Sequence, residues 1–178
     1  MGHLPLPTLR DGLANVLLSP RDAGRVELIV RRPADDQREL LTEAELSCDT
    51  GLVGDKWSVV YKGTAPNAQA QLTLMNARAA ALVAGRADHG GIAGDQLYVD
   101  LDLSHANLPP GTRLYVGSAV IEVTAEPHTG CGKFVRRFGV DAMKFVNSAD
   151  GRQLNLRGIN AKVIVGGTVR PGDTISKA

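Results

Sequence analysis

Apolar and polar residues alternate in five short stretches of the chain. The alternating apolar positions are Val26, Leu28 and Val30; Ala44 and Leu46; Leu97 and Val99; Leu114 and Val116; and Val163 and Val165. Because successive side chains of a strand point to opposite faces, this period predicts five strands, each with one buried face. Cys48 continues the second alternation, so we expect its side chain to pack in the core.

A tight hairpin is predicted near the middle of the chain. Only Gly117 and Ser118 separate two short apolar segments, 113–116 and 119–123. A glycine in the first of two linking positions favours a type II′ turn. We therefore expect the two segments to pair as antiparallel strands.

Helices are expected to be few and short. Asn76 ends a predicted strand over 71–75 and can cap an alanine-rich helix over 77–84 that stops at Gly85. A second helix is predicted to begin near Gly132 and to break at Gly139.

A third predicted helix, over 141–147, follows that break. The next residues, 147–153, are polar and rich in loop-forming types, so they are interpreted as a loop.

The composition indicates one domain with mainly β structure. The chain has 178 residues, of which 43% are hydrophobic and 22% charged, and this length is too short for two ordinary domains. Its 20 glycines and 9 prolines indicate many turns between short elements. We expect a mainly β (α+β) fold with a few short helices, in which residues 24–178 form a single domain and residues 1–23 an N-terminal extension.

Charge and hydropathy argue against several classes of partner. The formal net charge is +1 at pH 7, so neither nucleic acid nor an anionic membrane is an expected partner. No apolar run approaches the roughly 20 residues that cross a bilayer, and the proline-containing N-terminus lacks a signal-peptide pattern. We expect a cytoplasmic protein with a flexible N-terminal segment, and the ordering of that segment against a second subunit would make a homodimer.

The segment Pro127–Phe134, with the sequence PHTGCGKF, carries the densest candidate chemistry. Glycines on both sides of Cys131 leave room for a ligand, and a helix that starts at Gly132 would place N–H groups beside the sulfur and favour the thiolate. His128 could accept a proton or bind a ligand. The structural alternative is a small residue at a strand-to-helix corner.

Basic side chains gather near this cysteine. Lys133, Arg136 and Arg137 lie on the predicted helix, and Arg157 follows in a later loop. Such groups beside a helix start can bind phosphate, although a solvated helix face explains the same pattern equally well.

Several segments, in this order, resemble a MOSC domain, the C-terminal domain of molybdenum-cofactor sulfurases. They are GLVGDK at 51–56, QLTLMN at 71–76, GIAGDQL at 91–97, LPPGTRLYVG at 108–117, and the Cys131 segment with RRFG at 136–139. The similarity runs from about Gly24 to Gly172, and the HTGC stretch is similar to the small stand-alone bacterial subgroup.

The resemblance implies a closed β-barrel and a cysteine-centred site. Cys131 matches the family's site cysteine, which in sulfurases is proposed to carry sulfur and in N-hydroxyl-reducing relatives is linked to molybdenum ligation. The resemblance thus implies Cys131 and His128 as catalytic residues, Cys131 as metal ligand, and a molybdenum cofactor (molybdopterin). The residues implied to contact that cofactor are Asp55, Lys56, Thr129, Lys133, Arg136 and Arg157.

Two departures from the family pattern affect these contacts. Lys56 and Trp57 stand where Arg and His are common, and Asp95 and Gln96 stand where Glu and Asn are common. Lys56 keeps a positive charge but lacks the bidentate fork of arginine. The aminotransferase-like domain of sulfurases is absent from this sequence, so no pyridoxal phosphate site is expected.

Three functions remain open at this point. The first is an oxidoreductase that reduces N-hydroxylated or N-oxide small molecules at a molybdenum centre, with electrons from a separate electron-donor protein. The second is a sulfur carrier that receives a persulfide on Cys131 from a cysteine desulfurase. The third is a cofactor-binding module without turnover.

Overall fold

The computed structural model describes residues 2–59, 63–86 and 91–178. The elements in chain order are α1 (Leu6–Val16), β1 (Ala23–Arg31), β2 (Glu39–Leu40), β3 (Ala44–Ser47), β4 (Gly51–Leu52), the 3-10 turns η1 (Lys56–Ser58) and η2 (Ala68–Ala70), β5 (Leu72–Asn76), α2 (Ala77–Ala84), β6 (Leu97–Asp100), β7 (Arg113–Val116), β8 (Ala119–Val123), α3 (Gly132–Val146), α4 (Ala149–Gln153), β9 (Ile159–Val165), β10 (Gly167–Val169) and β11 (Thr174–Lys177).

Seven of the described strands close into a mixed barrel. Their order is β1-β6-β5-β9-β8-β7-β11, and the barrel closes because β11 pairs with both β7 and β1. Only the pair β5–β6 is parallel among these neighbours in the described chain. The short strand β2 extends β1, and β10, β3 and β4 form a small second sheet. The predicted fold class, a mainly β closed barrel with a few short helices, is confirmed.

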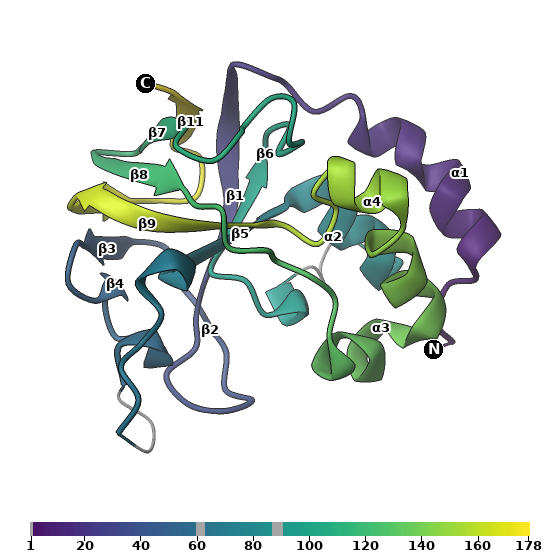
Figure 1. Cartoon of the computed structure of the whole chain (residues 1–178), viewed down its shortest axis with the longest axis horizontal. Helices are drawn as coiled ribbons and strands as arrows, with labels where there is room; N and C mark the ends of the chain where they lie inside the picture. Colours follow the sequence, from purple (N-terminus) through teal and green to yellow (C-terminus); the bar gives the residue numbers. More distant parts are fainter. Residues whose placement is uncertain (1, 60–62, 87–90) are drawn as a thin grey trace.

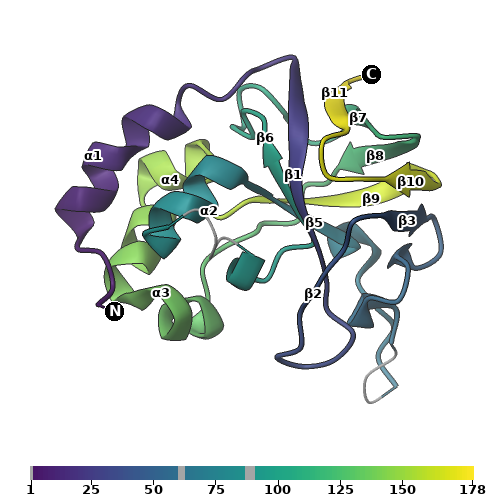
Figure 2. The ribbon, with the colours of Figure 1, turned by 180° about the vertical axis from the view of Figure 1, so that it is seen from behind.

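The helices cover one side of the barrel and create a second core. Figures 1 and 2 show α1, α2, α3 and α4 grouped on that side, with β3 and β4 away from them. On β6, Leu97 and Val99 point into the barrel, whereas Tyr98 packs in the helical layer with Phe134 and Phe138. The strand is therefore buried on both faces. Burial of each such side chain contributes about 1.5–3 kcal/mol.

Strand β1 departs from strict alternation. A β-bulge between Val26 and Leu28 shifts the register of its pairing with β6. As a result Val26 and Ile29 enter the barrel core, whereas Val30 joins the helical layer. The prediction that Val26, Leu28 and Val30 share one face is wrong, because an extra residue in a strand reverses the faces beyond it.

The other strand predictions hold with two exceptions. The positions on β3, β6 and β7 are buried in the barrel as predicted, and the hairpin turn has a positive φ of 56° at Gly117. Val165, however, is 50% exposed at the end of β9. Cys48 is also exposed, because β3 ends at Ser47 and the chain turns before another inward position.

Local helix signals agree with the structure around α2 and α3. The Asn76 side chain accepts a hydrogen bond from the Ala79 N–H at 2.9 Å, and Gly85 ends α2 with a φ of 70°. Helix α3 is interrupted at Gly139, whose φ is 88° and ψ 170°, so the predicted break is confirmed. The predicted loop after α3 is instead partly helical, because the Ser148 hydroxyl accepts from the Gly151 N–H at 3.0 Å and caps α4.

The N-terminal segment is ordered against its own chain. Proline stands at the first turn of α1, where no N–H is needed for the helix, and Leu9 is fully buried in the helical layer. The Leu6 N–H also donates to the Asp141 carboxylate at 3.1 Å. The expectation of a flexible tail is therefore wrong, whereas a homodimer stays a prediction. In the described part of the chain, no helix has the length and apolarity to span a membrane.

Candidate functional site

Cys131 occupies the start of α3, on the exposed side of the helical layer. It is the N-cap residue with extended backbone, and its thiol is free and exposed. The preceding Gly130 is held by Asn147 at the end of the same helix. The Gly130 N–H donates to Asn147 Oδ1 at 2.9 Å, and Asn147 Nδ2 donates to the Gly130 carbonyl at 3.3 Å. This two-way contact fixes the loop that carries the cysteine.

The surroundings of Cys131 favour the thiolate. Partial burial raises the pKa of the thiol, but the backbone N–H groups of Phe134 and Lys133 and the charges of Arg157 and Arg137 outweigh it, so the net pKa lies below the usual value. The Cys131 side chain does not form a capping hydrogen bond with the N–H groups at the start of α3. The helix start therefore acts on the sulfur chiefly by its field and its N–H groups.

A buried ion pair lies behind the cysteine loop. Arg157 Nη1 donates to Asp95 Oδ2 at 2.7 Å, and Arg157 Nη2 donates to the Ala93 carbonyl at 3.3 Å. The guanidinium carbon lies 5.1 Å from the centre of the Phe134 ring, in a cation–π arrangement. Asp95 is fully buried. These contacts hold the Arg157 side chain in place, and removal of either partner of the pair would leave an uncompensated buried charge.

His128 faces the second oxygen of this carboxylate. Its Nδ1 lies 3.5 Å from Asp95 Oδ1, and both atoms are buried without a hydrogen bond. Burial lowers the pKa of His128 to about 4, against the opposing charge of Asp95 and together with the repulsion of Arg157 and Arg32. The imidazole is therefore neutral at pH 7. It can accept or donate a hydrogen bond, but it is not the imidazolium form that could act as a general acid.

Three guanidinium groups converge beside Gly94. Arg32 Nη1 donates to the Gly94 carbonyl at 2.8 Å, and a Cβ at Gly94 would lie 3.0 Å from Arg137 Nη1 and 3.8 Å from Arg38 Nη2. Burial and the charges of Arg137 and Arg32 lower the pKa of Arg38. Arg38 Nε is buried and has no hydrogen-bond partner among the residues that the structure describes. Like charges this close, with an unpaired N–H, form a setting that an anion would stabilise.

The predicted cofactor contacts fall into separate groups. Lys56 and Lys133 share one carboxylate: Lys56 Nζ contacts Asp35 directly, and Lys133 Nζ lies 3.8 Å from Asp35 Oδ1. Arg136 is exposed on α3, and Thr129 is exposed beside His128. Lys56 and Lys133 thus lie together at the surface.

Asp55 has a supporting position. It is 2% exposed, its Oδ2 accepts from Arg32 N and Nε at 2.9 Å each, and its Oδ1 accepts from Arg32 Nη2 at 2.8 Å and Trp57 N at 3.0 Å. Its oxygens are occupied, so Asp55 orients Arg32 instead of meeting a ligand. Gln96 is likewise buried, and its Oε1 accepts from Thr73 N at 2.8 Å between β5 and β6.

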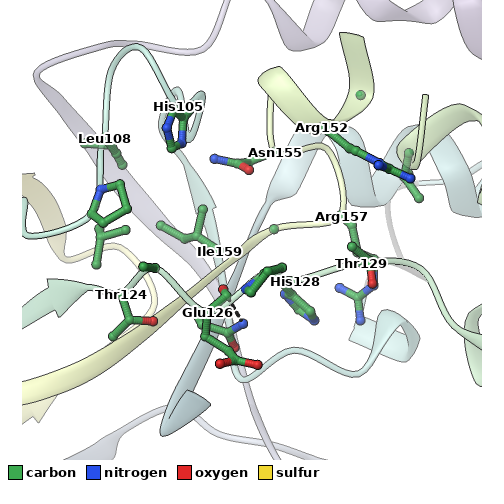
Figure 3. Close-up of a pocket in the computed structure, with 18 residues that line it drawn as sticks. His105, Leu108, Thr124, Glu126, His128, Thr129, Arg152, Asn155, Arg157 and Ile159 are labelled. Atoms are coloured by element: carbon green, nitrogen blue, oxygen red, sulfur yellow. Dashed lines mark hydrogen bonds between the residues drawn. The ribbon is translucent and has the colours of Figure 1, made fainter. Parts of the chain in front are cut away.

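A hollow of about 370 Å³ lies between the end of the barrel and α4 (Figure 3). His128, Thr129 and Arg157 line it, whereas Cys131 does not. The cysteine therefore does not border this hollow, although one loop carries both His128 and Cys131.

Asp95, Arg32, Arg38 and Asn147 were missed from the sequence. Arg32 and Arg38 lie about a hundred positions before Cys131, and nothing in their local pattern points to it. Asp95 did occur in a quoted motif, GIAGDQL, and an aspartate after a glycine at a strand start was the available signal.

Comparisons with known proteins show the fold. No family model matches the chain, and no curated protein matches it in sequence. Among solved structures, the YuaD protein from Bacillus subtilis has 17% identity and a TM-score of 0.59, covering 86% of this chain and 94% of YuaD. YiiM from Escherichia coli has 18% identity and a TM-score of 0.59, covering 86% of this chain and 69% of YiiM.

A third structure agrees with these. YiiM from Geobacillus stearothermophilus has 11% identity and a TM-score of 0.53, covering 89% of this chain and 73% of that protein. At these identities the likeness establishes a shared fold.

Proposed function

We propose that this protein is a MOSC-type domain that binds a molybdenum cofactor through Cys131. The observation that carries the proposal is the exposed thiol of lowered pKa at a helix start, next to Arg157 and Arg137. The barrel shared with YuaD and YiiM agrees with the fold that the MOSC resemblance implies.

The residues present fit such a cofactor. A soft thiolate is a suitable ligand for molybdenum, and the pterin phosphate needs N–H or cationic donors. The unpaired Nε of Arg38, within the cluster of Arg32, Arg38 and Arg137, is a buried donor of this kind. In this proposal Cys131 ligates the metal, and the guanidinium cluster with Lys56 and Lys133 holds the anionic part.

The proposed reaction is the reduction of an N-hydroxylated or N-oxide compound. The N–O bond breaks with uptake of two electrons and two protons, and water leaves. When bound, the cofactor supplies the two-electron chemistry, and a separate electron-donor protein supplies the electrons. His128 contributes as a neutral hydrogen-bonding group, because its low pKa excludes a stored proton at pH 7.

Metal analysis tests the proposal directly. Protein purified from a host that makes the cofactor should contain about one molybdenum per chain, as expected for a single thiolate ligand. Cys131→Ala should lose the metal, whereas Cys48→Ala, which removes the other exposed cysteine, should retain it. Wild-type protein without molybdenum from such a host would overturn the proposal.

A sulfur-carrier function is the second candidate, and the same exposed thiolate favours it. The Cys131 thiolate would attack the outer sulfur of a desulfurase persulfide, so that a new S–S bond forms and the desulfurase thiolate leaves. Mass spectrometry after incubation with a cysteine desulfurase and cysteine should then show one added sulfur on Cys131. Failure to load, beside a carrier that does load, would exclude this function.

A non-catalytic module is the remaining alternative. It would bind the cofactor through Cys131 but show no reduction with any electron donor. Activity of the loaded protein with a defined donor separates it from the first proposal.

A further inference from the structure

The hollow beside α4 is lined by both apolar and polar side chains. Leu108, Val123 and Ile159 are among its apolar lining residues, and Asn155, Asn160 and His128 are among the polar ones (Figure 3). Its volume of about 370 Å³ lies in the range of small-molecule pockets.

Both asparagines in the wall are fixed by their NH₂ groups. Asn155 Nδ2 donates to the Leu103 carbonyl at 2.8 Å, and Asn160 Nδ2 donates to the Glu126 carbonyl at 3.0 Å. These contacts fix the orientation of each amide, and no hydrogen bond from a described residue reaches either Oδ1, so each oxygen is free to accept one from a ligand. Asn160 is only 4% exposed, so its orientation is held by close packing as well.

His128 adds a third acceptor to the same wall. The Asp95 carboxylate beside Nδ1, at 3.5 Å, favours the tautomer in which that nitrogen carries the proton. Arg157 holds the other oxygen of Asp95 at 2.7 Å, so the carboxylate is fixed in place. Nε2 then presents a lone pair, and no described residue donates a hydrogen bond to it. Asp95 is thus a positioning residue for His128.

We propose that this hollow, which Cys131 does not line and which shares His128 with the proposed reaction site, is a ligand site for a small uncharged molecule that combines a flat apolar ring with N–H donors. The donors would meet Asn155 Oδ1, Asn160 Oδ1 and His128 Nε2, and the ring would lie against Ile159. Glu126 and Arg152, of opposite charge, both line the hollow, and the charge of Arg157, which also lines it, is balanced by the buried Asp95, so neither sign of ligand charge is favoured. The proposal goes beyond molybdenum binding and does not depend on it.

A pair of matched probes tests the ligand chemistry. Benzamide carries a ring and two N–H donors, and N,N-dimethylbenzamide carries the ring without them. Titrations followed by amide NMR should shift signals of residues that line the hollow, and benzamide should bind about tenfold more tightly, since one or two hydrogen bonds are lost in the other probe. Equal binding of the two probes, shifts confined to other surfaces, or no shifts would each overturn the proposal.

Variants test the acceptors themselves. Asn160→Ala and His128→Phe should each weaken benzamide binding several-fold, whereas Asn67→Ala, an exposed asparagine outside the hollow, should leave it unchanged. Long-range ¹⁵N spectra of His128 supply a separate measurement, and they should show Nδ1 protonated in the wild type and a change of tautomer in Asp95→Asn. Retained binding in both hollow variants, or a protonated Nε2 in the wild type, would contradict the assignment. Metal-free protein should bind benzamide equally, so failure here is distinguishable from failure of the molybdenum proposal.

Discussion

The two buried aspartates near the Cys131 loop differ in which of their carboxylate oxygens are hydrogen-bonded. The second oxygen of Asp95 faces His128, whereas the oxygens of Asp55 are occupied by Arg32 and Trp57. Two aspartates that each follow a glycine in similar motifs thus have different surroundings. Asp95 contacts His128 and Arg157, whereas Asp55 orients Arg32.

The buried imidazole of His128 makes stability depend on pH. Its pKa is lowered from 6.5 to about 4 in the folded protein, so between these values the unfolded chain binds the proton more strongly. Above pH 6.5 this group does not lower the free energy of unfolding. As pH falls from 6.5 towards 4, protonation of His128 in the unfolded chain lowers that free energy by about 3 kcal/mol in all. Urea unfolding at a series of pH values should show a shallower acid decline in His128→Gln than in the wild type. The exposed His105→Gln should follow the wild type, and an unchanged decline in His128→Gln would refute the prediction.

Position 158, next to His128, has a backbone conformation and a tight packing that only glycine fits without strain. Its φ is 112°, and a Cβ there would overlap the Leu74 carbonyl oxygen and lie 3.1 Å from His128 Nδ1. Gly158→Ala should lower the free energy of unfolding by at least about 2 kcal/mol, because steric overlap adds to backbone strain.

Gly111→Ala is the matched control for this prediction. Gly111 also has a positive φ, of 90°, but nothing lies within 4 Å of its Cβ position, so only the strain applies. Chemical denaturation of both variants measures the difference, and equal losses would show that the close approach at Gly158 does not matter.

At the scale of elements, the Cys131 loop is a short connection anchored at both ends of one helix. Its far anchor, Asn147, lies at the C-cap of α3 and reaches back to Gly130. The kink at Gly139 turns the helix so that its two ends can meet. The position of the thiol therefore depends on the shape of α3 as a whole.

Loss of the anchor should change the chemistry of the thiol. In Asn147→Ala the loop no longer holds Cys131 against the N–H groups of Phe134 and Lys133, so the pKa of the thiol should rise towards its usual value. The pH dependence of alkylation, measured in a Cys48→Ser background, reports this pKa. The rate at neutral pH should fall several-fold, whereas Asn67→Ala should have no effect. An unaltered pH profile in Asn147→Ala would exclude the anchoring role.

At the scale of the whole molecule, the barrel closes through its last strand. β11 joins β7 to β1, and Ile175 at its centre is fully buried. The helical layer, with α1 from the other end of the chain, packs on the outside of this barrel.

The stability of the closed barrel should therefore depend strongly on the Ile175 side chain. Ile175→Ala removes buried apolar volume between both neighbours of β11 and should cost about 2–5 kcal/mol of the free energy of unfolding. Val165→Ala, at a half-exposed position on β9, should cost less than about 1 kcal/mol. Thermal and urea unfolding of the two variants check this, and a small loss at Ile175 would mean that β11 contributes little to the barrel.

The sequence alone determined most of the local elements and the position of the cysteine at a helix start. Alternating apolar residues, Asn76 and Gly85 around α2, and the glycines beside Cys131 all act over a few residues, so their effects are visible in the pattern. For the same reason the break at Gly139 was predictable. The bulge in β1 was not, because it depends on pairing with β6.

The tertiary structure alone decided which distant charged groups meet. Arg157 and Arg137 act on the Cys131 thiol, Arg157 pairs with Asp95, and Arg32 and Arg38 lie beside Gly94, although these residues are far apart in the chain. Cys48 became exposed and α1 became part of the core for a similar reason: burial depends on what packs against a residue, and that partner lies elsewhere in the sequence.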